Sequence, residues 1–549
     1  MYDVYQPLVF VNETSELATG SIVFTPGLAQ NWTTSPDYTT FTFHLRQHIN
    51  FSNGDLFNAY QVWMQMYGQY YVSAYSNIWD SEYPIFNMAN ASSFGPSTVS
   101  LINSSGGLIN PTGPALNIMK NSSWPIYVTD PYTIVFHLSA PFLWLPSIFA
   151  TEIGQIWDSQ YILDNGGFGT PSAINSYFDE HGIPGTGPYM VSGISFNSYI
   201  KFTQNPTYWG NSLSPVQISQ QPLLDPGHVK NIVVNYKPDD LSRYTDLASG
   251  AADISAIQSQ DWNLVNNNPV FSYFKTPPWS PEASMLGLNT QLYPTNITDV
   301  RQAIVHAINY SQIYNQAWLG HMTPYVGPEY PAWNQFYDLG NFTPYQYNVS
   351  LAMQDIAAAN LTNPPTLNMI IQAGCSACTT AAQVIQQDLG VIGLNVNIEV
   401  LAPSSYIAGW YVGSFTQQVA DAAKLGHLNF DFGGLAWAPG ALTPADYWVT
   451  FVSNQSTNNF ALYNNPTVQA CDNAFTSSSN VSYIQSVCRP AQAQIYKDAP
   501  YAWIGVNGLW EPSGGSLVWK NSVIKGFLAD PLFTGEDWSP FFNTVIFAS

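Results

Sequence analysis

The chain has 549 residues, with 13 Lys and Arg against 35 Asp and Glu, and a formal net charge of −22. Charged residues make up only 9% of the chain and aromatic residues 15%. This composition excludes a disordered protein, because disordered chains are rich in charge and poor in aromatics. The 13 cations give no basic surface for phosphates, so we expect no nucleic-acid partner.

Membrane insertion is also not expected. No stretch reaches the roughly 18–20 consecutive apolar residues that a spanning helix needs, and the best candidate, residues 142–150, contains Pro146. The first residues lack the basic start and apolar stretch of a secretory leader. We therefore expect either a cytoplasmic protein or a chain whose leader has been removed, with any anchor absent from this chain.

Cysteine and asparagine usage favours a location outside the cytoplasm. The four cysteines fall into two close pairs, Cys375/Cys378 and Cys471/Cys488, although four cysteines allow three pairings. Many N-x-Ser/Thr sequences indicate an extracellular glycoprotein, because glycans would add the solubility that charges do not. Asn309 is set aside because it closes a helix-like stretch. The expected glycosylation sites are Asn12, Asn31, Asn50, Asn90, Asn103, Asn121, Asn296, Asn341, Asn348, Asn360, Asn454 and Asn480.

Strand and helix patterns alternate along the chain. Residues 41–45, 132–138 and 229–236 are rich in β-formers. A helix is predicted over 241–249, with Asp before its first turn and Gly250 after its last. Further on, a strand at 285–289 precedes a helix at 299–308. A strand at 366–371, a helix at 375–389 and a strand at 394–400 then follow, and such alternation predicts an α/β protein.

The sharpest chemical candidate is the sequence Cys375-Ser-Ala-Cys378 before a predicted helix. A helix N-terminus lowers the pKa of a thiol, so the arrangement is similar to a redox dithiol. A short disulfide that stiffens a loop outside the cell is the alternative that we prefer.

Metal, cofactor and catalytic sites are not expected. His44 and His48 lie on a predicted strand with no third ligand. Neither a phosphate-binding loop nor a G-x-S-x-G sequence occurs. The acidic pairs Asp179/Glu180, Asp239/Asp240 and Glu536/Asp537 are sequence neighbours, whereas a glycosidase needs carboxylates that face each other across a cleft. We therefore expect no enzyme activity, and we read Asp239/Asp240 as a helix cap.

Several motifs occur in an order that resembles one known family over nearly the whole chain. They are Tyr5–Val9, Gly27–Trp32, Phe41–Arg46 with Phe51, Gly54, Ala59 and Val62, Asp130–Pro141, Gly185–Tyr189, Asn205–Gly210, Val229–Ser255 with Asp240 and Arg243, Leu288-Asn289, and Val300–Ile304. In this order they resemble the family 5 extracellular solute-binding proteins of ABC transporters, of the oligopeptide- and dipeptide-binding type.

The resemblance implies a two-lobed, periplasmic-binding-protein-like α/β fold of class II, with an extra subdomain on the first lobe. The implied division is 1–30 for the first part of lobe I, 31–184 for the extra subdomain, 185–270 for the second part of lobe I, 271–504 for lobe II and 505–549 for the return to lobe I. The implied partners are a ligand held between the lobes and the permease subunits of an ABC importer, for a protein that is extracellular and associated with the cell surface.

The ligand class stays open between an oligopeptide and an oligosaccharide. In the family's peptide binders, an Asp three residues after a Trp holds the peptide ammonium group, whereas here Gly440 follows Trp437. Gly440 stands three residues after Trp437, so the carboxylate that would pair with the ammonium group is missing. Its absence argues against a peptide with a free amino-terminus, and aromatic residues could instead stack on sugar rings. The expected ligand contacts are Gln6, Leu8, Asn289, Trp410, Tyr411, Trp437, Ala438 and Gly440.

Two other functions remain as alternatives, a carbohydrate-active enzyme and a surface-layer-type glycoprotein. The low charge content also leads to a hypothesis about habitat. Few titratable groups leave few ways for stability to change with pH, which suggests a protein exposed to acid.

Overall fold

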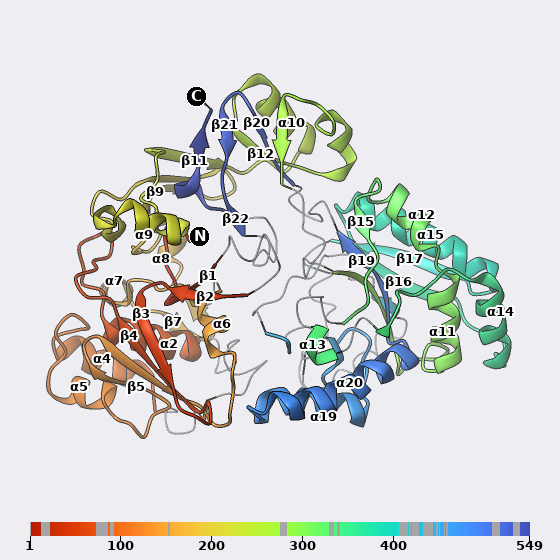
Figure 1. The fold of residues 1–549 in the computed structure, drawn as a ribbon, viewed down its shortest axis with the longest axis horizontal. Coiled ribbons are helices and arrows are strands. Elements are labelled where there is room, and N and C mark those ends of the chain that lie inside the picture. Colours follow the sequence, from red (N-terminus) through yellow and green to blue (C-terminus); the bar gives the residue numbers. More distant parts are fainter. Residues whose placement is uncertain are drawn as a thin grey trace.

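The structure is a computed structural model. It describes residues 2–12, 22–72, 86–87, 93–151, 154–274, 283–328, 334–337, 341–402, 405, 416, 419, 428–431, 443–445, 448, 451–454, 456, 459–507, 516–530 and 539–548. Figure 1 shows a red and orange body at the lower left, a yellow-green and blue body at the top, and a green, teal and blue body at the right. We call residues 29–164 the subdomain, residues 2–12, 22–26, 169–274 and 516–548 lobe I, and residues 283–507 lobe II. Residues 9–11, 24–26 and 169–170 of lobe I lie beside the subdomain at the lower left.

The subdomain is built on a four-stranded antiparallel sheet in the order β3-β4-β6-β5. The side chains of β4 alternate between buried and half-buried, as the predicted strand at 41–45 requires. The strands are β3 (Ala29–Thr34), β4 (Thr40–Leu45), β5 (Ile126–Asp130) and β6 (Thr133–His137). Its helices are α2 (Ala59–Val72), α4 (Pro96–Ser104), α5 (Gly113–Met119), α6 (Leu145–Phe149) and α7 (Ser159–Asp164).

Helix α2 is the central helix of the subdomain, because almost every side chain on it is buried. Asn58 caps its start by accepting hydrogen bonds from the backbone N–H groups of Tyr60 and Gln61, at 2.9 and 3.1 Å. Trp63 and Tyr67 on α2 both donate hydrogen bonds to the carbonyl oxygen of Ile126, at 3.0 and 2.9 Å. These bonds give both buried polar groups a partner and join the helix to the sheet.

Lobe I contains several small sheets. Its elements are β1 (Val9–Val11), β2 (Phe24–Pro26), β7 (Gly169–Thr170), β8 (Ala173–Ile174), α8 (Tyr177–His181), β9 (Tyr189–Ser195), β10 (Tyr199–Gln204), η3 (Trp209–Ser212), α9 (Pro215–Gln220), η4 (Pro222–Leu224), β11 (Asn231–Asn235), α10 (Asp240–Ser249), β12 (Ile254–Ile257), η5 (Ser259–Leu264) and β13 (Phe271–Tyr273). The chain returns to lobe I through β20 (Ser516–Lys520), β21 (Ile524–Gly526), β22 (Ala529–Asp530), β23 (Ser539–Pro540), η8 (Phe542–Thr544) and β24 (Ile546–Phe547).

The predicted helix at 241–249 is confirmed as α10. Its N-cap, Asp239, accepts a hydrogen bond from the backbone N–H of Ser242 at 2.7 Å. Gly250 ends the helix at φ 85°, a left-handed conformation that glycine adopts at little cost. The expectation that Asp239 caps a helix is therefore confirmed.

Lobe II is a six-stranded mixed sheet in the order β15-β19-β14-β18-β16-β17. Its strands are β14 (Ala283–Leu288), β15 (Met322–Thr323), β16 (Leu367–Gln372), β17 (Val396–Leu401), β18 (Leu428–Asp431) and β19 (Tyr501–Asn507). Its helices are α11 (Thr298–Ala307), α12 (Tyr310–Gln316), α13 (Asn334–Tyr337), α14 (Val349–Ala358), α15 (Ser376–Val391), α19 (Pro466–Ser477) and α20 (Val481–Asp498). The strands and helices predicted between 285 and 400 are confirmed to within about two residues, the ordinary uncertainty of element ends.

The chain passes from lobe I to lobe II between β13 and β14, and returns between β19 and β20. Strand β20 lies between β12 and β13, so the returning chain completes the sheet that the outgoing chain left. The domain boundaries expected from the sequence stay predictions. These pairings place 271–273 in a lobe I sheet and 501–507 in the lobe II sheet.

Two disulfides join the cysteines as the close pairs Cys375–Cys378 and Cys471–Cys488. The second disulfide connects α19 to α20. Cys375 and Cys378 are both buried and lie at the start of α15, which agrees with the structural disulfide preferred above.

Three buried aspartates make the stability of the fold depend on pH. Burial raises the pKa of Asp158 to about 7 and the pKa of Asp240 and Asp472 to about 6, against a reference of 3.8. Asp55 raises the pKa of Asp158 further, whereas Arg243 lowers that of Asp240. A raised folded-state pKa stabilises the fold below the unfolded pKa, and this stability is lost as the pH rises through the folded pKa.

We therefore predict a higher unfolding midpoint at pH 4 than at pH 7. The exposed groups Asp37 and Asp239 act in the opposite direction, because hydrogen bonds lower their pKa, but solvent screens them. The measurement is the thermal midpoint followed by circular dichroism. A midpoint that falls steeply between pH 7 and pH 4 would contradict both this prediction and the acid-habitat hypothesis.

The matched variant is Asp472→Asn, because Asp472 is buried and its side chain accepts a hydrogen bond from the Ser453 hydroxyl at 2.7 Å. The wild type loses the contribution of Asp472 as the pH rises, whereas the variant does not. The free energy of unfolding of the variant, relative to that of the wild type, should therefore increase by about 2 to 3 kcal/mol from pH 4 to pH 7.

Candidate functional site

One edge of the lobe II sheet faces the two chain crossings. Strands β16, β17 and β18 run parallel, so their carboxyl ends meet at one edge. Ala283, where the chain enters the lobe, pairs with Val506, and Met322 pairs with Asn507, where the chain leaves it. Since β14 is antiparallel to β18, these residues lie at the same edge as those carboxyl ends. We call it the crossing edge.

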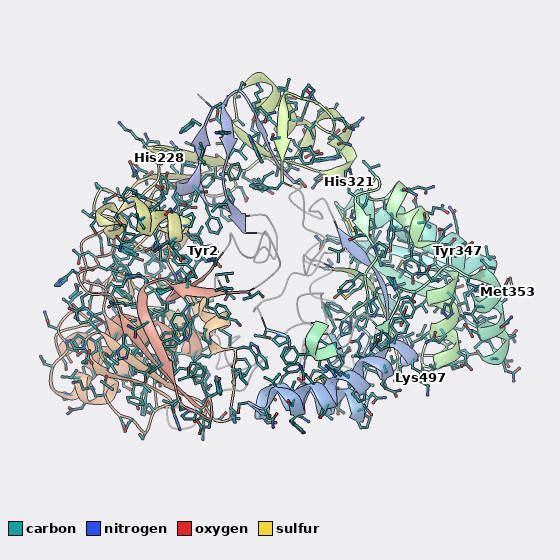
Figure 2. The ribbon with its side chains drawn as sticks, viewed as in Figure 1. Tyr2, His228, His321, Tyr347, Met353 and Lys497 are labelled. Carbon is teal, nitrogen blue, oxygen red and sulfur yellow. A yellow bond between two sulfur atoms is a disulfide. The ribbon has the colours of Figure 1, made fainter. Side chains whose placement is uncertain are left out.

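Lobe I contacts this edge directly. The ring of Trp262 in η5 lies 6.0 Å from the ring of His321, the residue before β15, in an edge-to-face arrangement. Figure 2 labels His321 at the side of lobe II nearest the top body. In α/β sheets, ligands bind outside the carboxyl ends of the strands, so the crossing edge is the candidate ligand-binding edge.

Most of the expected ligand contacts lie outside the described residues. Trp437, Ala438 and Gly440 follow β18, which runs toward the crossing edge, and Trp410 and Tyr411 precede it. The structure therefore places the strand that leads into the segment with Trp437, and the ligand contacts of these five residues stay predictions.

Asn289 lies at the opposite edge of the sheet, directly after the end of β14. Its side chain is buried, and its Oδ1 accepts a hydrogen bond from the backbone N–H of Gln291 at 2.9 Å. Its role in ligand binding also stays a prediction.

Gln6 and Leu8 are both fully buried in lobe I. Gln6 donates a hydrogen bond to the Tyr208 hydroxyl at 2.9 Å and accepts one from the Trp209 indole N–H at 2.7 Å. The Thr186 hydroxyl donates a further, longer bond to Gln6 at 3.4 Å. Gln6 thus joins the N-terminal segment to both of the most specific motifs of the sequence, and a ligand contact for Gln6 or Leu8 stays a prediction.

The glycines of the Gly185–Tyr189 motif allow the N-terminal segment to lie against it. A Cβ on Gly185 would come within 1.9 Å of the Val4 carbonyl oxygen, and one on Gly187 within 2.3 Å of the Asp3 carbonyl oxygen. Both distances are shorter than any real Cβ contact, so only glycine fits these positions.

The second motif, Asn205–Gly210, closes the same assembly. Asn205 is buried and its side-chain amide donates a hydrogen bond to the Gly187 carbonyl oxygen at 2.9 Å. The guanidinium of Arg46 lies 5.0 Å from the centre of the Trp209 ring and donates a hydrogen bond to the Gly27 carbonyl oxygen at 2.7 Å. These contacts connect the subdomain to lobe I.

The other charged motifs make similar connections. Arg243 donates hydrogen bonds to Asp240, at 2.7 Å, and to the carbonyl oxygen of Ala256, at 2.8 Å, which fixes α10 against β12. In lobe II, Arg301 donates to the carbonyl oxygens of Asp498 and Thr295, both at 2.8 Å, which fixes α11 against the end of α20. The motifs that carry the family resemblance therefore hold the scaffold together.

The described residues contain no group of three or more His, Cys, Asp and Glu side chains that could hold a metal ion. His44 lies on β4, and its Nδ1 is 3.4 Å from the Thr133 hydroxyl. Across the part of the chain that the structure describes, no helix has the length and apolar character needed to span a membrane.

The comparisons with known proteins agree with one another. The model of the bacterial extracellular solute-binding proteins, family 5 (middle region), matches residues 23–459. The di/tripeptide-binding protein 2 of Pseudomonas aeruginosa is 24% identical over 399 residues, which are 70% of this chain and 65%, just under two thirds, of that relative. The nickel-binding periplasmic protein of Escherichia coli is 24% identical over 432 residues, 75% of this chain and 68% of that relative.

Solved structures share the fold over the full length. The ABC transporter-associated periplasmic binding protein DppA of Helicobacter pylori, in complex with the peptide STSA, superposes with a TM-score of 0.68 at 20% identity, covering 100% of this chain and 93% of that one. NikA of Brucella suis, in complex with Fe(III)-EDTA, gives a TM-score of 0.65 at 18% identity, covering 98% and 94%. The two-lobed fold expected from the sequence is confirmed.

The hydrogen bonds of Gln6 generate a prediction about stability. Gln6→Leu replaces the amide by an apolar side chain of similar size. The Trp209 N–H and the Tyr208 hydroxyl then lose their bonds to Gln6, so the change should lower the free energy of unfolding by about 1–3 kcal/mol. Urea unfolding followed by far-ultraviolet circular dichroism measures the loss. Gln220→Leu is the control, because Gln220 is exposed on the same surface helix, α9. Equal stability of Gln6→Leu and the control would contradict the assignment.

Proposed function

Because the chain belongs to the family 5 extracellular solute-binding proteins, we propose that it captures a small solute between its two lobes and delivers it to the permease subunits of an ABC importer. The family match over residues 23–459 carries this proposal. Capture requires no covalent bond to break. A ligand that makes better contacts in the closed form shifts the population of molecules toward that form.

A short peptide is the ligand class that we propose. The relatives named for binding di/tripeptides and glutathione support it, and others are named for nickel and heme. No comparison supports an oligosaccharide. Gly440 offers no carboxylate for a peptide ammonium group, so peptides with an acetylated amino-terminus should bind at least as tightly as free ones.

The experiment is native mass spectrometry of the purified chain, which reveals a ligand that copurifies, followed by calorimetry. The titrants are matched pairs of free and acetylated di- to pentapeptides, with oligosaccharides as the control. Saturable binding of peptides alone supports the proposal. Saturable binding of oligosaccharides alone overturns the peptide assignment, and binding of neither class overturns the transport function.

We predict that Trp437→Ala weakens ligand binding by about thirtyfold or more, since a buried aromatic contact is a typical hot spot. Unfolding of the variant should match that of the wild type. Trp32→Ala is the control, because Trp32 is half-buried on β3 of the subdomain. Unchanged affinity of Trp437→Ala would refute the placement of the ligand beside this segment.

We further propose that the protein is extracellular, associated with the cell surface, and glycosylated. The Asn side chains at nine of the expected sites are exposed, which glycan attachment requires; these are Asn31, Asn50, Asn103, Asn121, Asn296, Asn341, Asn348, Asn360 and Asn480. Asn12 and Asn454 are half-buried, and Asn90 lies outside the described residues. Intact mass of the chain from its native source, before and after chemical deglycosylation, should show the difference, and an unchanged mass would refute glycosylation.

A further inference from the structure

Trp144 belongs to the subdomain but completes an aromatic cluster in lobe II. It directly precedes α6, and its ring lies 5.8 Å from that of Phe142 in its own body. Across the boundary, the same ring lies 6.0 Å from that of Phe336 in α13 and 5.4 Å from that of Phe475 in α19, both edge-to-face. Edge-to-face contact at these separations is a favourable geometry for aromatic pairs.

Phe336 and Phe475 of lobe II form the surface on which the Trp144 ring packs, and we call this pair the socket. Phe475 is fully buried and contacts Phe336 at 5.7 Å. Tyr337 stacks on Trp448 at 5.1 Å and donates a hydrogen bond to the Pro444 carbonyl oxygen. The disulfide between α19 and α20 holds the helix that carries Phe475. The socket is therefore built by contacts within lobe II.

The subdomain holds Trp144 equally firmly. Pro146 lies in the first turn of α6, where proline suits a helix. At the other end of α6, Phe149 packs edge-to-face on Phe43 and Phe136 of the sheet, at 5.2 and 4.7 Å. Trp144 is thus attached to the subdomain through α6.

The contact lies away from the two chain crossings. Figure 1 shows α6 and α19 in the lower half of the molecule, whereas β12 and β20 lie at the top. The Trp262–His321 contact lies on the side of the crossings. Rotation of the lobes about the crossings would therefore separate Trp144 from its socket.

Separation would expose a large apolar surface. Trp144 is 9% exposed in this structure, and a single cluster of buried apolar residues runs from the subdomain through Trp144 into lobe II. An aromatic ring of this size buries on the order of 150–250 Å². Withdrawal from the socket would return part of that area to water, at a cost in free energy.

We propose that Trp144 is a latch that holds the subdomain against lobe II whether or not a ligand is bound. The latch raises the population of the closed form before the ligand arrives. Two protein surfaces make this contact, so the proposal does not depend on which solute the protein carries. Its removal should lower the ratio of closed to open molecules by about tenfold to a hundredfold.

The test compares Trp144→Ala with Trp124→Ala in the ligand-free chain, prepared by dialysis in denaturant and refolding. Trp124 is the matched control, because it is 7% exposed and stacks on Trp63 at 5.6 Å inside the subdomain. Dyes on Lys120→Cys and Lys497→Cys report the distance between subdomain and lobe II by single-molecule energy transfer. Both lysines are exposed, and Figure 2 labels Lys497 on lobe II.

The expected result is a shift toward low energy transfer and faster hydrogen exchange in residues 466–477 for Trp144→Ala, with the Trp124→Ala distribution unchanged. Trp144→Phe, which keeps a ring, should be intermediate and serves if the alanine variant does not fold. An unchanged distribution in a folded Trp144→Ala or Trp144→Phe chain overturns the latch, and so does an equal shift in Trp124→Ala.

Discussion

The buried amide of Gln6 is the interaction on which the first half of the molecule depends. It bonds to Tyr208 and Trp209, and the Thr186 hydroxyl donates to it, so three distant stretches of chain meet at one side chain. Inside an apolar environment, each of these polar groups would be costly without a partner. The two glycines of the neighbouring motif let the backbone approach closely enough for the bonds to form. A single polar group thereby aligns the N-terminal segment, lobe I and, through Trp209 and Arg46, the subdomain.

The sequence predicted the regular elements well where local physics determines them. Alternating side chains marked β4, and a cap residue with a terminal glycine marked α10, because each signal acts within a few residues. The ordered motifs also identified the fold. What they do in the structure was not predictable. The sequence does not distinguish an arginine that binds a ligand from one that binds backbone carbonyl oxygens. Arg301 donates to the carbonyl oxygens of Asp498 and Thr295, and only the fold brings Asp498 to it.

The ligand site was the hardest part to predict for the same reason. The crossing edge is defined by strand order, since β14 lies between β18 and β19, far from each of them in the chain. No local pattern encodes that order. Trp144 is a similar case, because its partners Phe336 and Phe475 lie in another body. An aromatic residue before a short helix gives no sign in the sequence that it packs outside its own subdomain.

The position of β20 has a consequence for the way the chain folds during synthesis. β20 lies between β12 and β13, and the backbone N–H groups of Phe542 and Asn543 donate hydrogen bonds to Asp3. Lobe I therefore stays incomplete until residues 516–543 have left the ribosome, whereas the described strands of the lobe II sheet lie between 283 and 507. Contacts between distant residues form slowly, because long loops must close first. We expect lobe II to form as a unit while the lobe I sheet still lacks β20, so the pairing of β20 with β12 and β13 follows the formation of lobe II.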